Sequence, residues 1–196
     1  MIVQTLFWFA FAFALAALEI EIEGQYGWAE KLPTWYRTRG LAARAFSLLT
    51  GGKPLTGYHL WLLVFLVLAF HLPFVSGAPW SPAAECSTLA RLCFFAVFWD
   101  YLWFILNLDY GWRGMPNAWW HSLGVMLLGQ IPLGFVMGLG ASFALSAAAG
   151  ALVDQLVLMA GCLVLLVPTI LLSPLYHRWH LKMRESDERP KIRLPR

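Results

Sequence analysis

Three carboxylates stand at the end of the first apolar run of this chain. The run covers about residues 2–22, and the segment Leu18–Gly24 (LEIEIEG) places Glu19, Glu21 and Glu23 at its end. A carboxylate inside a bilayer costs about 2.5–3.5 kcal/mol, so it needs a partner, a proton, water or a cation. These three side chains constrain the fold, because the rest of the chain must supply the groups that stabilise them.

The composition is typical of an integral membrane protein. Hydrophobic residues make up 60% of the chain and charged residues 13%, against roughly a half and a quarter in soluble domains. The mean hydropathy is +0.63. Five apolar runs are long enough to cross a bilayer, at about 20 residues per crossing, and they cover about residues 2–22, 58–75, 89–108, 123–145 and 151–172. The sequence therefore predicts an all-α bundle of about five transmembrane helices in one domain, residues 1–176, followed by a basic tail, residues 177–196.

The first run could be mistaken for a signal peptide. A signal peptide begins with a basic region, whereas no Lys or Arg precedes Lys31 in this chain. We therefore expect the first run to be a retained helix.

The basic residues indicate the orientation. Five of them stand between the first two spans: Lys31, Arg37, Arg39, Arg44 and Lys53. The tail from His177 adds seven Lys or Arg against three acidic residues. Cytoplasmic loops are enriched in Lys and Arg, so we expect the N-terminus outside and the C-terminus in the cytoplasm, in a prokaryotic cytoplasmic membrane.

The segment after the first span predicts a short amphipathic helix at the membrane surface. Leu41, Phe46 and Leu49 stand opposite Arg37 and Arg44 in a helical pattern. The alternative interpretation is a plain basic loop.

Small residues repeat at every fourth position in the fourth span. Such a ridge lets another helix approach closely, and it predicts helix–helix association through Gly134, Gly138, Ser142 and Ser146. We expect membrane lipids, and no nucleic acid, as the other partners.

Most of the polar residues fall at the cytoplasmic ends of the predicted spans. Glu19 and Glu23 are four residues apart and share one helix face, while Glu21 points elsewhere. His59 begins the second span, on the same side. Asn107, Asp109 and His121 also lie at that level, whereas Asp100 and His71 lie deeper, where they could pair.

Carboxylates and imidazoles together favour a site for Zn, Fe or Mn. The predicted metal ligands are Glu19, Glu23, His71, Asp100 and His121. The predicted catalytic residues are Asp100, His121 and Glu23, and the predicted substrate-binding residues are Arg113, Trp103, Asn107 and His59. The alternative is that the glutamates are interface residues, hydrated or paired with the arginines of the first loop.

Three functions fit these features. The first is a membrane-embedded, metal-dependent enzyme that acts on a lipid or isoprenoid at the cytoplasmic leaflet. The second is a non-catalytic membrane subunit or assembly factor, and the third is a small transporter or proton relay using Asp100 and His71. The sequence contains neither GxGxxG nor GxxxxGK[ST], and no GxSxG motif, so it lacks the usual signs of nucleotide binding or of a serine hydrolase.

Overall fold

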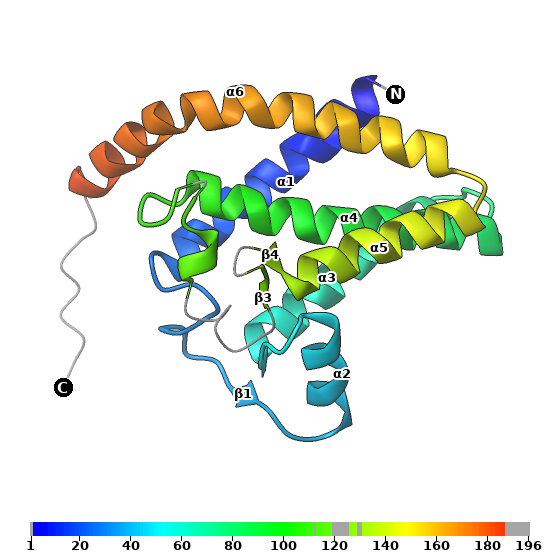
Figure 1. Ribbon diagram of the computed structural model, residues 1–196, viewed down its shortest axis with the longest axis horizontal. Coiled ribbons are helices and arrows are strands. Elements are labelled where there is room, and N and C mark those ends of the chain that lie inside the picture. Colours follow the sequence, from blue (N-terminus) through cyan, green and yellow to red (C-terminus); the bar gives the residue numbers. More distant parts are fainter. Residues whose placement is uncertain (1, 112, 119–125, 129–130, 187–196) are drawn as a thin grey trace.

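Helix α4 (Pro82–Leu106) is the centre of the molecule, because α1, α3, α5 and α6 all pack against it (Figure 1). The computed structural model describes residues 2–111, 113–118, 126–128 and 131–186. Within these residues the chain is mostly helical and has very little sheet, so the predicted all-α membrane bundle is confirmed. The elements in chain order are α1 (Ile2–Glu23), β1 (Tyr36–Arg37), α2 (Leu41–Leu49), β2 (Leu55–Thr56), α3 (Gly57–Val75), α4, η1 (Met115–Asn117), β3 (Met126–Leu127), β4 (Ile131–Pro132), α5 (Leu133–Ala148) and α6 (Leu152–Glu185).

Helix α4 is buried on several sides. The side chains of Phe95, Phe98 and Leu102 are almost inaccessible. Trp8 of α1 and Phe70 of α3 stack with their ring centroids 4.6 Å apart, and both contact Phe95. Aromatic pairs at such distances contribute about 0.5–1.5 kcal/mol beyond their buried area. An aromatic layer therefore joins three helices around α4.

Four helices are long and apolar enough to cross a membrane: α1, α3, α4 and α6. The fifth apolar helix, α5, has 16 residues. At 1.5 Å per residue it is shorter than the roughly 30 Å hydrocarbon layer. The fourth predicted span, residues 123–145, is therefore wrong in its first part. Met126–Leu127 and Ile131–Pro132 pair as an antiparallel hairpin, and the helix begins only at Leu133.

Two other helices extend beyond the predicted spans. Helix α4 begins at Pro82, earlier than residue 89, because Ser81 caps it by accepting a hydrogen bond from the amide of Ala84. Helix α6 has 34 residues and continues to Glu185, past the predicted end at residue 172. The first residues of the predicted tail are therefore part of a long helix.

The extension of α6 is held by polar contacts with α4 and α1. The ring of His177 lies 3.1 Å from the carbonyl oxygen of Ile105. His180 and Arg184 lie 3.1 Å and 3.6 Å from the carboxylate of Glu21. These contacts give the end of α6 a docking site on α1 and α4, which explains why the helix continues.

The predicted ridge of small residues on α5 contacts other elements of the same chain. At Gly138 an added Cβ would lie 2.6 Å from Val97 Cγ2 of α4, and at Gly134 it would lie 3.0 Å from the carbonyl oxygen of Thr50. Ser142 accepts a hydrogen bond of 3.1 Å from the buried side chain of Gln155. The ridge therefore lets α5 approach α4, the loop after α2, and α6.

The orientation predicted from the basic residues can be tested by cysteine labelling. In a background without the native cysteines Cys86, Cys93 and Cys162, Ala78→Cys lies between α3 and α4, and Ser186→Cys follows α6. We expect an impermeant maleimide added to intact cells to label Ala78→Cys, and to label Ser186→Cys only after permeabilisation. The reverse pattern would show that the chain is inverted.

Candidate functional site

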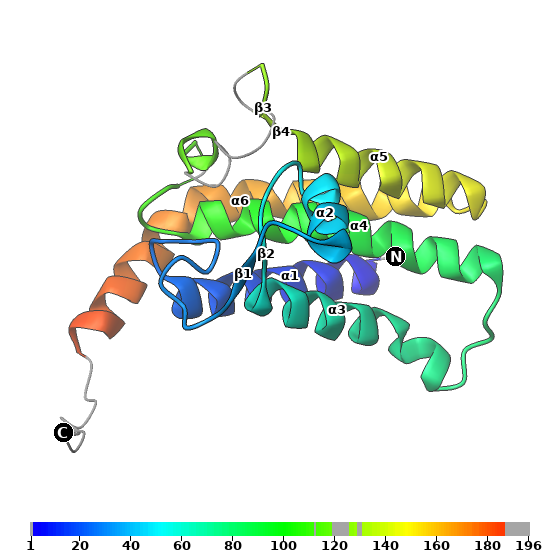
Figure 2. The same cartoon turned by 90° about the horizontal axis from the view of Figure 1, so that it is seen from below.

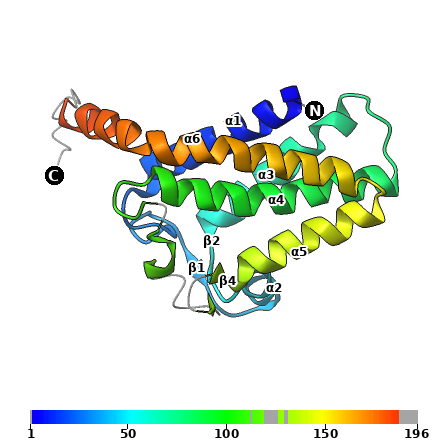
Figure 3. The same cartoon turned by 45° about the horizontal axis from the view of Figure 1, so that its top comes forward.

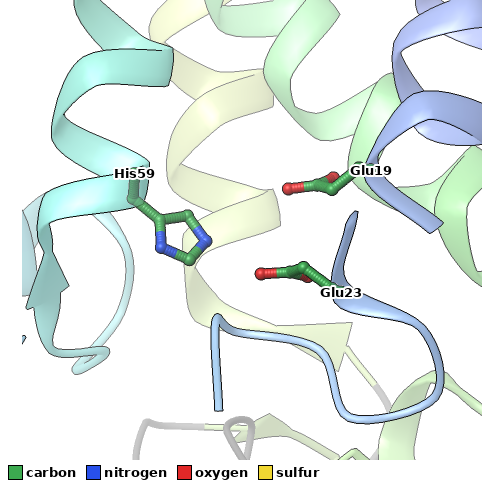
Figure 4. A group of neighbouring side chains, drawn as sticks. All are labelled: Glu19, Glu23 and His59. Carbon is green, nitrogen blue, oxygen red and sulfur yellow. The ribbon is translucent and has the colours of Figure 1, made fainter. Parts of the chain in front are cut away.

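Two carboxylates of α1 and an imidazole of α3 meet inside the molecule. The ligand atoms of Glu19, Glu23 and His59 all lie within 4.8 Å of one another, and all three side chains are buried. Figure 4 shows the three side chains pointing into one common space from two separate helices. We call these residues the triad. The helical spacing of four residues places both carboxylates on one side of α1, as predicted.

The loop after α1 holds Glu23 in place. Its oxygen Oε1 accepts a hydrogen bond of 2.5 Å from the amide of Ala29. Trp28 and Ala29 have φ angles of 44° and 55°, and Gly24 and Gly27 also have positive φ. Backbone with positive φ can turn successive amides toward an anion. Residues other than glycine adopt this left-handed conformation at a cost of about 1–3 kcal/mol. The loop is therefore wound around the carboxylate at the expense of backbone strain.

Glu19 is held from another direction. The hydroxyl of Tyr58 donates a hydrogen bond of 3.3 Å to its oxygen Oε1. The indole nitrogen of Trp99 lies beside this carboxylate, without a hydrogen bond of ordinary geometry. The tyrosine leaves other acceptor positions of the carboxylate unused.

His59 is oriented by the first turn of α3. Thr56 caps this helix by accepting a hydrogen bond from the amide of His59, and its hydroxyl also lies 2.7 Å from Nδ1 of the ring. The ring stacks on Trp28 with a centroid distance of 4.0 Å. With Nδ1 engaged by Thr56, the nitrogen Nε2 is the one left to bind in the space beside the glutamates. A fixed second ring nitrogen is the usual arrangement for a metal-binding histidine.

Lys53, one of the basic residues between α1 and α3, belongs to this site. The side chain of Lys53 is 8% exposed, and its ammonium lies 3.6 Å from Asp100 Oδ2 and 4.4 Å from the ring centroid of Trp28. The ammonium of Lys53 also attracts the carboxylate of Glu23, whereas the carboxylate of Asp100 repels both glutamates of the triad. Lys53 and Asp100 therefore form the second half of the site.

The site opens into a cleft of about 400 Å³. The polar residues gather at one end, and the remaining walls come mostly from apolar residues of α2, α3, α4 and α5. Figure 2 shows α3 and α5 on opposite sides of α4, with α2 in front of it. The volume lies within the range of about 300–1,000 Å³ that is usual for small-molecule sites.

Tyr36 contacts the outer side of the loop after α1. Its hydroxyl donates a hydrogen bond of 2.7 Å to the carbonyl oxygen of Trp28. Burial raises the pKa of Tyr36, and the nearby charges of Glu23 and Glu30 raise it further. The phenol therefore remains a neutral donor that fixes the position of Trp28, on which His59 and Lys53 rest.

The other predicted site residues lie in different places. Trp103 lines the cleft. Asn107 ties the end of α4 to the loop after α1, because its side chain donates a hydrogen bond of 3.0 Å to the carbonyl oxygen of Gly24. Arg113 is exposed, and His121 lies outside the described residues.

His71 is not brought to the triad, and it does not pair with Asp100. Its Nε2 lies 2.9 Å from Glu85, whose other oxygen accepts a hydrogen bond from Trp80. The early start of α4 places Glu85 within a helix, beside the last turns of α3. The alternative pairing of Glu19 and Glu23 with the arginines of the first loop is also not found among the ion pairs of the described residues.

Comparisons of this chain with protein-family models, with curated proteins and with solved structures find no match. The geometry of the site therefore carries the functional argument.

The pairing of Lys53 with Asp100 predicts a stability effect. We expect Lys53→Met to lower the free energy of unfolding by about 1–3 kcal/mol, because it leaves a charge without its partner in a largely buried place. Thermal unfolding in a mild detergent measures the change. The matched control is Lys31→Met, since Lys31 is exposed, its ion pair is with the exposed Glu30, and its ammonium likewise lies over an aromatic ring, that of Tyr26.

A double variant separates the ion pair from the packing of the lysine stem. Lys53→Met combined with Asp100→Asn removes both charges, so part of the lost stability should return. If the two residues did not interact, the double variant would be less stable than Lys53→Met by the full amount that Asp100→Asn costs on its own. That result would contradict the pairing.

Proposed function

We propose that the protein is a membrane-embedded, metal-dependent enzyme that acts on a lipid or isoprenoid substrate. The observation that carries the proposal is the triad, since its two carboxylates and one imidazole converge inside a membrane-type bundle. Burying ionisable groups inside a membrane-type bundle costs free energy, and such groups usually mark a functional site. A bound cation offsets this cost for all three ligands at once.

The charges of the site favour a divalent cation. Glu19, Glu23 and Asp100 carry three negative charges when ionised, and Lys53 carries one positive charge, which leaves two negative charges. A divalent ion balances them. Oxygen and imidazole ligands suit Zn, Fe or Mn, and a set of three protein ligands is typical of catalytic zinc sites, which keep a position open for substrate.

The residues around the triad have distinct tasks in this proposal. Glu19, Glu23 and His59 hold the metal, which supplies Lewis-acid chemistry and lowers the pKa of bound water. Asp100 is the proton acceptor, because it lines the cleft beside the triad without belonging to it. Lys53 positions the carboxylate of Asp100 through their ion pair, and it adds positive charge where a reacting oxygen becomes negative.

The cleft supports a lipid-like substrate. Its apolar walls continue from the polar end along α3, α4 and α5, so a molecule with one polar end and one apolar part satisfies both regions.

The alternative of a proton relay has less support. The pairing of His71 with Glu85 removes the relay partner that a proton pathway through Asp100 would need.

Metal content is the decisive test. We expect the purified protein to contain about one zinc, iron or manganese per chain, measured by inductively coupled plasma mass spectrometry. Glu19→Gln, Glu23→Gln and His59→Ala should each lose it, because each removes a ligand. The matched control is Glu21→Gln, since Glu21 lies on the same turn of α1 but pairs with α6.

The hydroxyl of Thr56 gives a finer version of the same test. Thr56→Val should bind the metal about 10–100-fold more weakly, as is usual when the partner of a ligating histidine is removed. A wild-type protein that holds no metal, even after reloading, would move the assignment to a non-catalytic membrane subunit.

A further inference from the structure

The extension of α6, residues 173–185, begins at a proline. Pro174 has no amide hydrogen, so it cannot donate the usual helical hydrogen bond to the carbonyl oxygen of Ile170. The hydroxyl of Ser173 donates a hydrogen bond of 2.9 Å to that oxygen instead. Figures 1 and 2 show the red end of α6 turned away from the direction of the rest of the helix, and Figure 3 shows it reaching past the ends of α1 and α4. The helix therefore continues beyond Pro174 with a change of direction and with this carbonyl oxygen paired.

One face of the extension is attached to the bundle. His177, His180 and Arg184 recur at spacings of three and four residues, so they share this face. His177 contacts the carbonyl oxygen of Ile105, and the other two contact Glu21. Ile105 and Glu21 lie in the last turns of α4 and α1, and both helices are candidate membrane spans. The extension therefore leaves the bundle at the level where two spanning helices end.

The opposite face of the extension is exposed and amphipathic. Leu175, Trp179 and Met183 stand four residues apart, and their exposed fractions are 58%, 53% and 46%. Arg178 and Lys182 form an exposed basic stripe beside them. Neither basic side chain belongs to an ion pair within the part of the chain that the structure describes. An apolar stripe bordered by basic residues is typical of a helix at a membrane surface.

The two basic residues of this face lie at the depth of lipid headgroups. Arg178 and Lys182 follow His177 by one and five residues, which is at most about 1.5 Å and 7.5 Å along the helix axis. The headgroup layer on each side of the hydrocarbon core is about 5–7.5 Å thick. The extension carries three basic residues against one acidic residue, Glu185. Charge complementarity at this depth therefore favours an anionic lipid.

We infer that the extension of α6 binds an anionic phospholipid, with Arg178 and Lys182 on the phosphate of its headgroup and with Leu175 and Trp179 against its chains. Each Lys or Arg near an anionic leaflet strengthens binding about fivefold, and the long basic side chains reach the phosphates while their stems stay in contact with apolar groups. Trp179 suits the boundary between headgroups and chains, where tryptophan is enriched. The site is separate from the cleft and does not depend on the proposed function.

Native mass spectrometry of the full chain tests this inference, because it counts the lipid molecules bound to each protein molecule. The probes are phosphatidylglycerol, which is anionic, and phosphatidylcholine with the same chains, offered in equal amounts. We expect the protein to bind phosphatidylglycerol preferentially. The double variant Arg178→Gln, Lys182→Gln should reduce that preference about 5–25-fold, since it removes both basic residues of the site. Its thermal stability and metal content should equal those of wild type, because both side chains are exposed and lie outside the triad.

The matched control removes the same charge elsewhere. Arg37→Gln combined with Arg39→Gln alters two exposed residues between α1 and α2, and it should leave the preference unchanged. An equal loss in both double variants would overturn the inference, since it would show a general effect of net charge. Equal binding of the two lipids would also overturn it and would favour a soluble acidic partner for this face. Displacement of phosphatidylglycerol by an equal concentration of soluble glycerol phosphate would overturn the lipid in favour of a free phosphate ester.

Discussion

The cost of burying charge in a low-dielectric interior governs this structure. Glu19 and Glu23 lie on the buried side of α1, so the chain must bring compensating groups to them from distant segments. The loop after α1 supplies an amide, α3 supplies His59 and the hydroxyl of Tyr58, and the segment before β2 supplies Lys53. The helices alone do not supply enough partners for these carboxylates. The irregular segment between α1 and α3 supplies the rest.

The shared helix face of the two glutamates could be predicted because it depends on local periodicity. The spacing of Glu19 and Glu23 fixes their shared face of α1, and the same spacing turns Glu21 away from it, where it meets His180 and Arg184. Helical geometry is a property of neighbouring residues, so it can be read from the sequence. The same reasoning gave the all-α membrane bundle.

The parts that were missed depend on contacts between distant residues. His59 was predicted to bind substrate, and depth favoured His71 as the metal ligand. The pairing of β1 with β2 and the cap at Thr56 instead bring the first turn of α3 to the end of α1. No local pattern indicates that the ammonium of Lys53 packs against the ring of Trp28. From the sequence, Lys53 is simply one residue of the basic loop. His121 lies outside the described residues, so its predicted part in the site stays a prediction.

The last turn of α1 has two faces with different partners. One face carries the triad, and the other carries Glu21, which is bound to the extension of α6. The extension of α6 is thus attached to the same turn of α1 that carries the triad. The residues that follow the extension in the sequence are basic, so one helical turn joins this basic segment, through Glu21, to the triad on its opposite face.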